Sequence, residues 1–537
     1  MTDTLYLDAN ATTQVMPVAA AAALRAMSSQ FGNPSSTHCD GLVAQAVLAQ
    51  ARAHAQQALG AGSGHLMFTS GATEGIQTAV LSALCAIRAQ RRRGEPGGRL
   101  LMVGATEHKA VPQSLAHWNS LLELDLEICT LPVNAQGAHD LDFLAQHLPD
   151  VALLCTMAAN NETGVVTRLS EIEQLLQATA SPALWLVDSV QALGKLPLNL
   201  QATRIDYAPF SGHKLYAPKG VGLLYVRAGA PFTPLMTGGG QELGLRSGTE
   251  NMAGIAALGA VLEALNQNQT FASLATLSGY QSRLAHSLQQ AFPGLIFNVA
   301  PEACLPTTLN FSVPGVSSKQ LLDLFDAASL RVSAGSACNA SSAAQAAPSF
   351  VLEAMGLPEA QTRSAVRLSF GPLTPPALVD QACAAIARCG QVLGLSPDAS
   401  AQPPAAAPTA LLAAMDWAAL EADCTLSWDA LANFLHQNPR AQLVDVRETF
   451  EHAASSDEPV NVPMNVPINV PINVPLSRLG DWVPQWLLSG EPLVFFCRSG
   501  QRSQKAVEHL VAHGHPKVRH LQGGLAFRPR RQDDALA

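Results

Sequence analysis

The sequence is poor in charged residues and has no hydrophobic run long enough to cross a membrane. Charged side chains make up only 14% of the 537 residues, whereas hydrophobic ones make up 48%. The first ten residues lack the basic and apolar pattern of a leader peptide. A net charge of -9 argues against nucleic acid or an anionic membrane as the main partner. These absences predict a cytoplasmic protein with no membrane contact and no direct nucleic-acid contact.

The ten cysteines are scattered along the chain, and no two of them form a CxxC pair. This spacing favours neither a zinc site nor a disulfide framework, so we expect no metal. Most of the cysteines are expected to be small buried hydrophobic residues. Cys338 and Cys497 differ from the others in their sequence surroundings.

A chain of this length exceeds one ordinary core, so we expect more than one domain. Apolar strands alternate with helical patterns, and polar residues follow the strands. The strands are expected near 66–69, 100–103, 151–157 and 184–191, and the helices near 42–59, 76–88, 252–265 and 274–291. This order predicts an α/β fold with a mainly parallel sheet and a site along its carboxyl edge. A smaller α+β unit is expected to end near Leu393.

Small and polar residues follow two of the predicted strands. Residues 70–75 read Ser-Gly-Ala-Thr-Glu-Gly and open a helix. A strand, a small-residue turn and a helix point backbone N–H groups at an anion such as a phosphate. A plain helix cap would use similar residues. After the next strand, His108 either lies flat against an aromatic ring or is an ordinary loop histidine.

Asp188 ends the apolar part of the expected strand 184–191. A buried carboxylate is unfavourable unless it meets a cation, and a protonated pyridine nitrogen would supply one. Gln191 could then bond the phenolic oxygen of the same ring.

Lys214 closes the stretch Phe-Ser-Gly-His-Lys at 210–214. A lysine forms a Schiff base only when part of its population is neutral, and burial or nearby cations favour the neutral form. Ser211 and His213 are placed to touch a phosphate. The alternatives are a surface lysine on a turn, and Lys219 as the reactive lysine of the same loop. A pyridoxal 5'-phosphate site requires a phosphate-binding turn, a residue that stacks on the ring, an acid and a lysine. The sequence offers all four, in residues 70–75, His108, Asp188 and Lys214.

Residues 333–348 are small, polar and without periodicity, so we expect a mobile loop that exposes Cys338. An exposed free thiol is a candidate nucleophile, although it could be an inert surface cysteine. Arg367 lies within a predicted strand, which is unusual unless it meets a carboxylate.

Residues 1–393 resemble a cysteine desulfurase of the NifS/IscS type, a fold-type I pyridoxal-phosphate enzyme. Nine segments carry the resemblance in order: FGNPSS, TSGATE, TEHKAV, NNETGVV, VDSVQALGK, PFSGHKLYAPKG, GGGQELGLRSGT, SAGSAC and VRLSFG. The resemblance implies a large domain with a mainly parallel sheet, a small α+β domain and a homodimer.

The resemblance also implies roles for individual residues. Lys214 would carry the cofactor and take the Cα proton of L-cysteine, and His108 would stack on the ring and shuttle protons. Asp188 would keep the pyridine nitrogen protonated, while Gln191 bonds the ring oxygen. The remaining implied contacts are Ala72, Thr73, Ser211 and His213 to the phosphate, Thr249 from the second subunit, Asn161 to the cofactor, and Asn33 with Arg367 to the substrate carboxylate. The Cys338 thiolate would attack the substrate sulfur and keep it as a persulfide, while alanine leaves.

A stretch rich in Pro, Ala and Ser at 394–424 is interpreted as a linker. Beyond it, an apolar strand runs into Cys497 and a helix follows, so helix N–H groups and two arginines are expected to stabilise the Cys497 thiolate. Residues 425–537 resemble a single α/β rhodanese domain through LVDVRE, NVPL, CRSGQRS and LQGG. The resemblance assigns the reactive loop to Cys497, Arg498, Gly500 and Arg502.

Two features of this second domain qualify the resemblance. Four residues separate Cys497 from Arg502, where related phosphatases carry five, and the tighter loop favours sulfur transfer. Residues 461–476 repeat Asn-Val-Pro four times, in place of the usual Gly-His-Ile-Pro-Gly-Ala. Proline at every fourth position excludes a helix or a central strand, so we expect an extended or disordered excursion. We interpret it as an expansion without function rather than a docking motif.

The sequence therefore predicts a cysteine desulfurase whose Cys338 persulfide is relayed to Cys497. Fusion raises the local concentration of one thiol near the other. Two alternatives remain: a selenocysteine lyase or another cysteine lyase, and a rhodanese part that serves only as a docking module. The final acceptor also stays open among an iron-sulfur scaffold, transfer-RNA thiolation and molybdenum-cofactor sulfuration.

Overall fold

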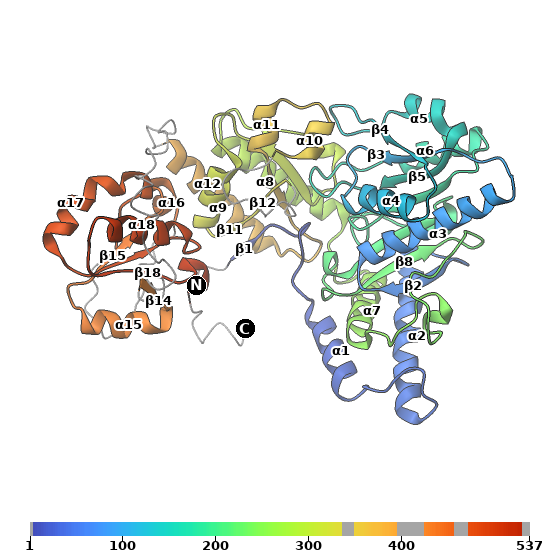
Figure 1. The fold of residues 1–537 in the computed structure, drawn as a ribbon, viewed down its shortest axis with the longest axis horizontal. Helices are drawn as coiled ribbons and strands as arrows, with labels where there is room; N and C mark the ends of the chain where they lie inside the picture. The colour runs from blue at the N-terminus through green and yellow to red at the C-terminus, as the bar shows by residue number, and fades with distance from the viewer. Residues whose placement is uncertain (1–3, 336–347, 395–423, 456–470, 529–537) are drawn as a thin grey trace. The chain divides into compact units, whose positions relative to one another are not determined.

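The computed structural model describes residues 4–335, 348–394, 424–455 and 471–528. The chain forms two compact units, shown in Figure 1. The larger unit contains residues 4–322 and 331–384, and the smaller one contains residues 323–330 and 385–537. Cys338, most of the expected linker and residues 461–470 of the Asn-Val-Pro repeat lie outside the described residues.

A seven-stranded sheet organises the larger unit. Its strand order is β2 (His65–Thr69), β8 (Gly222–Val226), β7 (Tyr207–Ser211), β6 (Leu184–Asp188), β5 (Val151–Met157), β3 (Leu100–Gly104) and β4 (Glu127–Leu131). Only β8 runs antiparallel to its neighbours. The expected mainly parallel sheet is thus confirmed, and β6 lies at its centre.

Helices cover both faces of this sheet. Successive residues of β5 face opposite sides, so Leu153 and Cys155 pack in one core and Leu154 in the other. The first core contains α3 (Ala72–Arg92) and α4 (Ala110–Leu121), and the second contains α1 (Pro17–Ser28), α2 (Cys39–Leu59), α5 (Leu141–His147), α6 (Leu169–Ala178) and α7 (Met252–Gln267). Burial on both faces explains the nearly continuous apolar strands in the sequence.

A small antiparallel sheet completes the larger unit. Its order is β12 (Ser333–Ala334), β13 (Val366–Ser369), β10 (Thr308–Ser312) and β9 (Ile296–Phe297). The neighbouring helices in sequence are α8 (Leu274–Ala291), α9 (Ser318–Ala327), α10 (Phe350–Ala354), α11 (Glu359–Ser364) and α12 (Pro376–Gly394), while β1 (Leu5–Tyr6) pairs with β11 (Leu330–Arg331). This arrangement confirms the expected α+β part.

The smaller unit contains a five-stranded parallel sheet. Its order is β14 (Thr425–Leu426), β18 (Val518–Leu521), β17 (Leu493–Phe496), β15 (Gln442–Asp445) and β16 (Ile472–Asn473). Its helices are α15 (Trp428–Gln437), α16 (Thr449–Ala454), α17 (Leu479–Ser489) and α18 (Gln501–Ala512). The described end of the Asn-Val-Pro repeat forms the edge strand β16, flanked by Pro471 and Pro475. An edge strand suits this sequence because proline has no N–H to donate, and a central strand must form hydrogen bonds with neighbours on both sides.

Short 3-10 helices connect several elements: η1 (Leu148–Asp150), η2 (Leu200–Ala202), η3 (Gly212–Lys214), η4 (Glu242–Gly244), η5 (Pro301–Ala303), η7 (Leu476–Arg478) and η8 (Gly524–Phe527). No helix in the described ranges has the length and apolar character needed to cross a bilayer. Within the same ranges, no group of His, Cys, Asp and Glu is arranged to hold a metal ion.

The expectation that most cysteines are buried is wrong. All nine described cysteines are free, and only Cys155, Cys389 and Cys497 are buried. Cys129 shows the reason, because it lies on the edge strand β4, where most side chains stay partly accessible.

We predict that Glu242 anchors the glycine-rich segment before α7. The Glu242 carboxylate is 1% exposed, pairs with Arg52 Nη2 at 2.6 Å and accepts the Phe68 N–H at 2.9 Å. Glu242→Ala leaves both donors without an acceptor and should destabilise the larger unit by about 3–5 kcal/mol. Calorimetric unfolding measures this, with the exposed Glu263→Ala on α7 as the control. Equal midpoints for the two variants would contradict the prediction.

Candidate active site

The predicted site residues follow four neighbouring parallel strands. His108 comes after β3, Asn161 after β5, Asp188 at the end of β6, and Lys214 in η3 directly after β7. Carboxyl ends of parallel strands meet at one edge of a sheet. The charges of Asp188 and Lys214 both act on the pKa of His108, as expected for side chains at one edge of the sheet.

Lys214 is partly buried, and its Nζ donates to the carbonyl oxygens of Asn10 and Ala11, at 2.7 Å each. Lys219, the rival lysine of the same loop, is exposed. The structure therefore distinguishes the two lysines by their surroundings.

Asp188 is buried at the end of the central strand, and burial raises the pKa of its carboxyl. Its Oδ1 accepts the Val190 N–H at 3.0 Å, and it forms no ion pair within the described ranges. Burial also raises the pKa of the neighbouring Glu107 well above its usual value, and the charge of Asp188 raises it further. A cation placed beside Asp188 would relieve this buried negative potential, as the protonated nitrogen of a pyridine ring does.

Burial also favours the neutral form of His108, in this case by lowering the pKa. Burial lowers its pKa, and Lys214 and Lys109 lower it further, although Asp188 acts in the other direction. Its Nδ1 accepts the Ala110 N–H at 3.2 Å. A neutral imidazole in this place can stack on an aromatic ring and exchange protons.

The start of α3 forms an anion cradle with the end of β7. The N-cap Gly71 offers no side-chain cap to this 21-residue helix, so Ala72 and Thr73 begin it with N–H groups available to an anion. A Cβ built on Gly71 would lie 3.9 Å from Ser211 Oγ. His213 lies nearby in sequence, its Nδ1 is 3.2 Å from Thr12 Oγ1, and its pKa is lowered by burial to about 4. The N–H groups at the start of α3 and the hydroxyl of Ser211 fit the phosphate of pyridoxal 5'-phosphate. The buried Asp188 fits its protonated ring nitrogen.

Arg367 is buried in β13 and is already held by the protein. Its Nη1 donates to the Asn161 carbonyl oxygen at 2.8 Å, and its Nη2 contacts Asp8 Oδ1 at 2.6 Å and Ser333 Oγ at 2.7 Å. Its Nε is buried without a partner in the described residues. The Nε–H is therefore a donor that the described residues leave for a further carboxylate. Asp8 is a contact that the sequence reasoning missed.

Two predicted residues stand apart from this cluster. Asn33 is exposed, and its side chain accepts the Ser35 N–H within its own turn. The structure does not bring it to Arg367. Thr249 is also exposed, in the segment before α7.

Cys338 lies outside the described residues, but both flanks of its segment are described. Ser333 bonds Arg367, and Ser349 Oγ donates to Glu162 Oε2 at 2.6 Å. Glu162 is buried, and burial raises its pKa. The two flanks are thus anchored beside Asn161 and Arg367.

The smaller unit presents the second candidate loop at the end of β17. Cys497 is buried, its Sγ accepts the Gly500 N–H at 3.2 Å, and Ser503 Oγ lies 3.6 Å away. The Gly-Gly of LQGG packs against this loop, because a Cβ on Gly524 would lie 2.2 Å from the Cys497 carbonyl oxygen. The expected strand, cysteine loop and helix are therefore all present.

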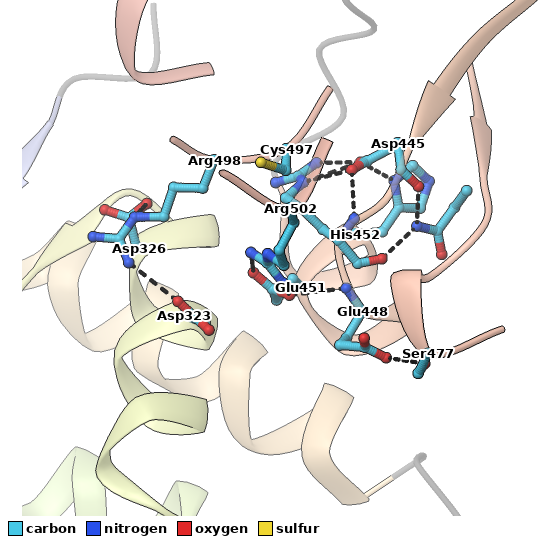
Figure 2. A network of polar contacts seen from close by, with 12 residues as sticks. Asp323, Asp326, Asp445, Glu448, Glu451, His452, Ser477, Cys497, Arg498 and Arg502 are labelled. Carbon is cyan, nitrogen blue, oxygen red and sulfur yellow. Dashed lines mark hydrogen bonds and ion pairs between the residues drawn. The ribbon is translucent and has the colours of Figure 1, made fainter. Parts of the chain in front are cut away.

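The two loop arginines are engaged with carboxylates. Arg502 Nη2 bonds the buried Glu451 at 2.7 Å, and Arg498 pairs with Asp323 at 3.1 Å and with Asp326 at 2.7 Å, as Figure 2 shows. The positive charge expected beside Cys497 is thus largely compensated, and among the described residues the Gly500 N–H is the backbone donor to its sulfur.

A buried carboxylate also holds the end of the adjacent strand β15. Asp445 accepts two bonds from Arg447 Nε, at 3.0 Å each, and contacts His452 Nδ1 at 3.0 Å. Although burial raises the pKa of Asp445, the bonds from His452 and Arg447 outweigh it, and the pKa is lowered. This network fixes the strand end that neighbours Cys497 (Figure 2).

Sequence reasoning also missed Asn10 and Lys195, which are buried beneath the cluster. Lys195 Nζ bonds Gln191 Oε1 at 2.6 Å and Asn10 Oδ1 at 3.1 Å. A glycine-lysine pair in a turn gives no local signal of burial, since lysine is most often exposed.

Comparisons with known proteins agree with this geometry. Residues 5–381 match the family of class-V aminotransferases, and residues 427–526 match the rhodanese-like domains. Cysteine desulfurase 2 of Trichormus variabilis is 37% identical over 378 residues, covering 70% of this chain and 90% of that protein. The solved structure of a NifS-like protein is 29% identical with a TM-score of 0.64, and covers 73% of this chain and 99% of its own. SspA, solved in complex with cysteine, is 28% identical with a TM-score of 0.58, and covers 69% of this chain and 99% of its own.

The buried acid, the lysine and the anion cradle at one sheet edge agree with these matches, and the chain therefore belongs to the class-V aminotransferase family as a pyridoxal-phosphate-dependent cysteine desulfurase of the NifS type that also carries a rhodanese-like domain.

Proposed function

We propose that this enzyme takes sulfur from L-cysteine onto Cys338 and passes it to Cys497 for delivery to an acceptor protein. The observation that carries the proposal is that one chain holds both the Lys214 site and the Cys497 loop, in which a backbone N–H bonds the sulfur at 3.2 Å. A desulfurase and a cysteine prepared to accept sulfur are thereby joined covalently.

When bound, pyridoxal 5'-phosphate supplies the electron sink that lets the Cα–H and Cβ–S bonds of cysteine break. Lys214 carries the cofactor and takes the Cα proton. Asp188 holds the proton of the pyridine nitrogen, and Arg367 binds the substrate carboxylate through the donor that the protein leaves free. Ala72, Thr73, Ser211 and His213 bind the phosphate, with Thr249 of the partner subunit, while Asn161 and Gln191 complete the cofactor contacts.

The sulfur steps balance without an external oxidant or reductant. The Cys338 thiolate attacks the substrate sulfur, so the Cβ–S bond breaks and an S–S bond forms. L-cysteine and the Cys338 thiol thus become L-alanine and a persulfide. The Cys497 thiolate then attacks the outer sulfur, which restores the Cys338 thiol and leaves the persulfide on Cys497. An iron-sulfur scaffold or a sulfur carrier is the proposed acceptor.

The loop around Cys497 supports its role as a receiver. The sulfur lies at the start of α18, where helix N–H groups stabilise a thiolate or persulfide anion. Because Glu451 engages Arg502, the loop keeps its shape without exposing that charge. We place the reaction in the cytoplasm, where thiols stay reduced.

We also propose a homodimer formed through α1, the turn after it and the start of α2. Leu24 and Met27 are each 62% exposed, Phe31 is 68% exposed, and Leu42 and Val43 are also exposed. An apolar set of this kind favours a protein contact. Figure 1 shows α1 and the adjoining end of α2 standing out from the sheet of the larger unit.

The lysine assignment can be tested with a matched pair of variants. Borohydride reduction of the loaded enzyme should fix pyridoxal phosphate on the Lys214 peptide, because Lys214 directly follows β7 at the site, whereas Lys219 is exposed. Lys214→Ala should lose the fixed cofactor, and Lys219→Ala should keep it. Peptide mass spectrometry reads both results, and label on Lys219 in the wild type would refute the assignment.

The relay predicts an order of persulfide formation. After L-cysteine is added, wild-type protein should gain sulfur on Cys338 and Cys497, whereas Cys338→Ser should gain it on neither. Cys497→Ser should gain it on Cys338 alone. The exposed Cys39 provides the control, since Cys39→Ser should match the wild type. Sulfur found on Cys338 alone in the wild type would mean that the rhodanese part is a docking module.

The dimer proposal predicts that added charge on the apolar set separates the subunits. The double variant Leu24→Glu with Phe31→Glu should elute with the mass of one chain in light-scattering chromatography. Leu121→Glu, at an equally exposed leucine on α4, should leave the dimer intact. A double variant of unchanged mass would remove this surface as the interface.

A further inference from the structure

Lys195 is a buried lysine whose amine meets no carboxylate among the described residues. The residue is 2% exposed, in the turn that follows Asp188 and Gln191. In the described part of the chain no carboxylate pairs with it, and its Nζ bonds are to Gln191 Oε1 and Asn10 Oδ1. An unpaired buried amine is unfavourable for stability, so its presence needs a reason beyond packing.

The amine fixes which way two amide groups face. Lysine nitrogen donates hydrogen bonds here, so the atoms that meet it must be the oxygens of Gln191 and Asn10. The Gln191 Nε2 is then turned away from Lys195, and it donates one N–H to the Asn10 carbonyl oxygen at 3.2 Å. Its second N–H remains for another acceptor.

Asn10 links this amide to the catalytic lysine. The same Asn10 carbonyl oxygen accepts Lys214 Nζ at 2.7 Å. The Asn10 side chain is held on its other side, because Nδ2 donates to Thr308 Oγ1 at 3.0 Å and to the Asn161 carbonyl oxygen at 3.3 Å. Asn10 is 1% exposed, so water does not compete for these bonds.

We propose that Lys195 is a positioning residue that locks the amides of Gln191 and Asn10, so that Gln191 presents an N–H to the ring oxygen of pyridoxal phosphate and Asn10 holds Lys214. The inference deepens the proposed function and rests on the cofactor contacts proposed for Gln191 and Lys214.

The electrostatic surroundings support this arrangement. Burial, together with the charges of Lys214 and Arg367, lowers the pKa of Lys195 to about 7. The effect is mutual, because positive charge on Lys195 disfavours positive charge on Lys214. Lys195 thus also favours the neutral amine that the Lys214 chemistry requires.

The test is a double-mutant cycle on the spectrum and affinity of bound cofactor. Lys195→Met removes the donors at similar length, and Gln191→Met removes the proposed cofactor contact. Apoenzyme variants are titrated with pyridoxal phosphate, and the absorption maximum, its pH titration and the dissociation constant are recorded. Each single variant should shift the absorption and weaken binding about tenfold, the size expected for one lost buried hydrogen bond.

The spectrum of the Lys195 and Gln191 double variant distinguishes a positioning role of Lys195 from a merely structural one. Because Lys195 acts through Gln191 as well as through Asn10, the spectral shift of the double variant should be smaller than the sum of the two single shifts. Fully additive effects, or an unchanged spectrum in folded Lys195→Met, would overturn the proposal. Lys219→Met is the matched control and should behave as wild type. Should Lys195→Met fail to fold, Lys195→Gln replaces it: it retains N–H donors and should keep the wild-type spectrum, whereas the full Gln191→Met shift would overturn the proposal.

Failure of the underlying function gives a different pattern. If Lys214→Ala retains covalently fixed cofactor, the lysine assignment is wrong whatever the cycle shows. If Lys214 is confirmed but Gln191→Met leaves the spectrum unchanged, only the positioning role of Lys195 is lost.

Discussion

The structure depends on a carboxylate kept out of water at the end of its central strand. Asp188 can be buried there because β6 has parallel neighbours on both sides and helices above and below. Burial raises the pKa of Asp188, so the ionised form is stable only beside a cation. The fold thereby leaves a buried carboxylate that a protonated pyridine ring would stabilise in its ionised form. The positions of His108 and Lys214 follow from the same sheet edge.

Around this acid, charges are balanced by polar contacts more than by ion pairs. Lys214 and Lys195 are both held by neutral oxygens, with Asn10 shared between them. The charge of Lys214 is one cause of the lowered pKa of Lys195. The rhodanese-like unit differs, because Arg498 and Arg502 form ion pairs with carboxylates. There the Gly500 N–H donates to the sulfur of Cys497. Backbone groups thus contact the reactive atom in each unit: carbonyl oxygens accept from Lys214 Nζ, and the Gly500 N–H donates to Cys497 Sγ.

Much of this could be predicted from the sequence where the signal is local. An acid at the end of an apolar strand marks Asp188, and strand, small-residue turn and helix mark the cradle at Ala72. The same local logic identified the loop at Cys497, because β17 and α18 flank it directly. Helix α8 has the bounds that its apolar pattern predicts.

What could not be predicted arises from contacts distant in sequence. Asn10 meets Lys195 and Lys214 across more than 180 residues, and a lysine in a turn carries no sign that it is buried. The compensation of Arg502 by Glu451 is likewise visible only in three dimensions. Asn33 illustrates the converse, because its side chain accepts a bond within its own Asn-Pro turn, and no contact with Arg367 is found among the described residues.

The proposed transfer of sulfur from Cys338 to Cys497 can be followed in a single-turnover experiment with radiolabelled cysteine. Label should appear first on the Cys338 peptide and then on the Cys497 peptide, at a second rate that does not change with protein concentration. Label that reaches Cys497 equally fast in Cys338→Ser, or at a rate proportional to concentration, would refute a transfer within the fused protein.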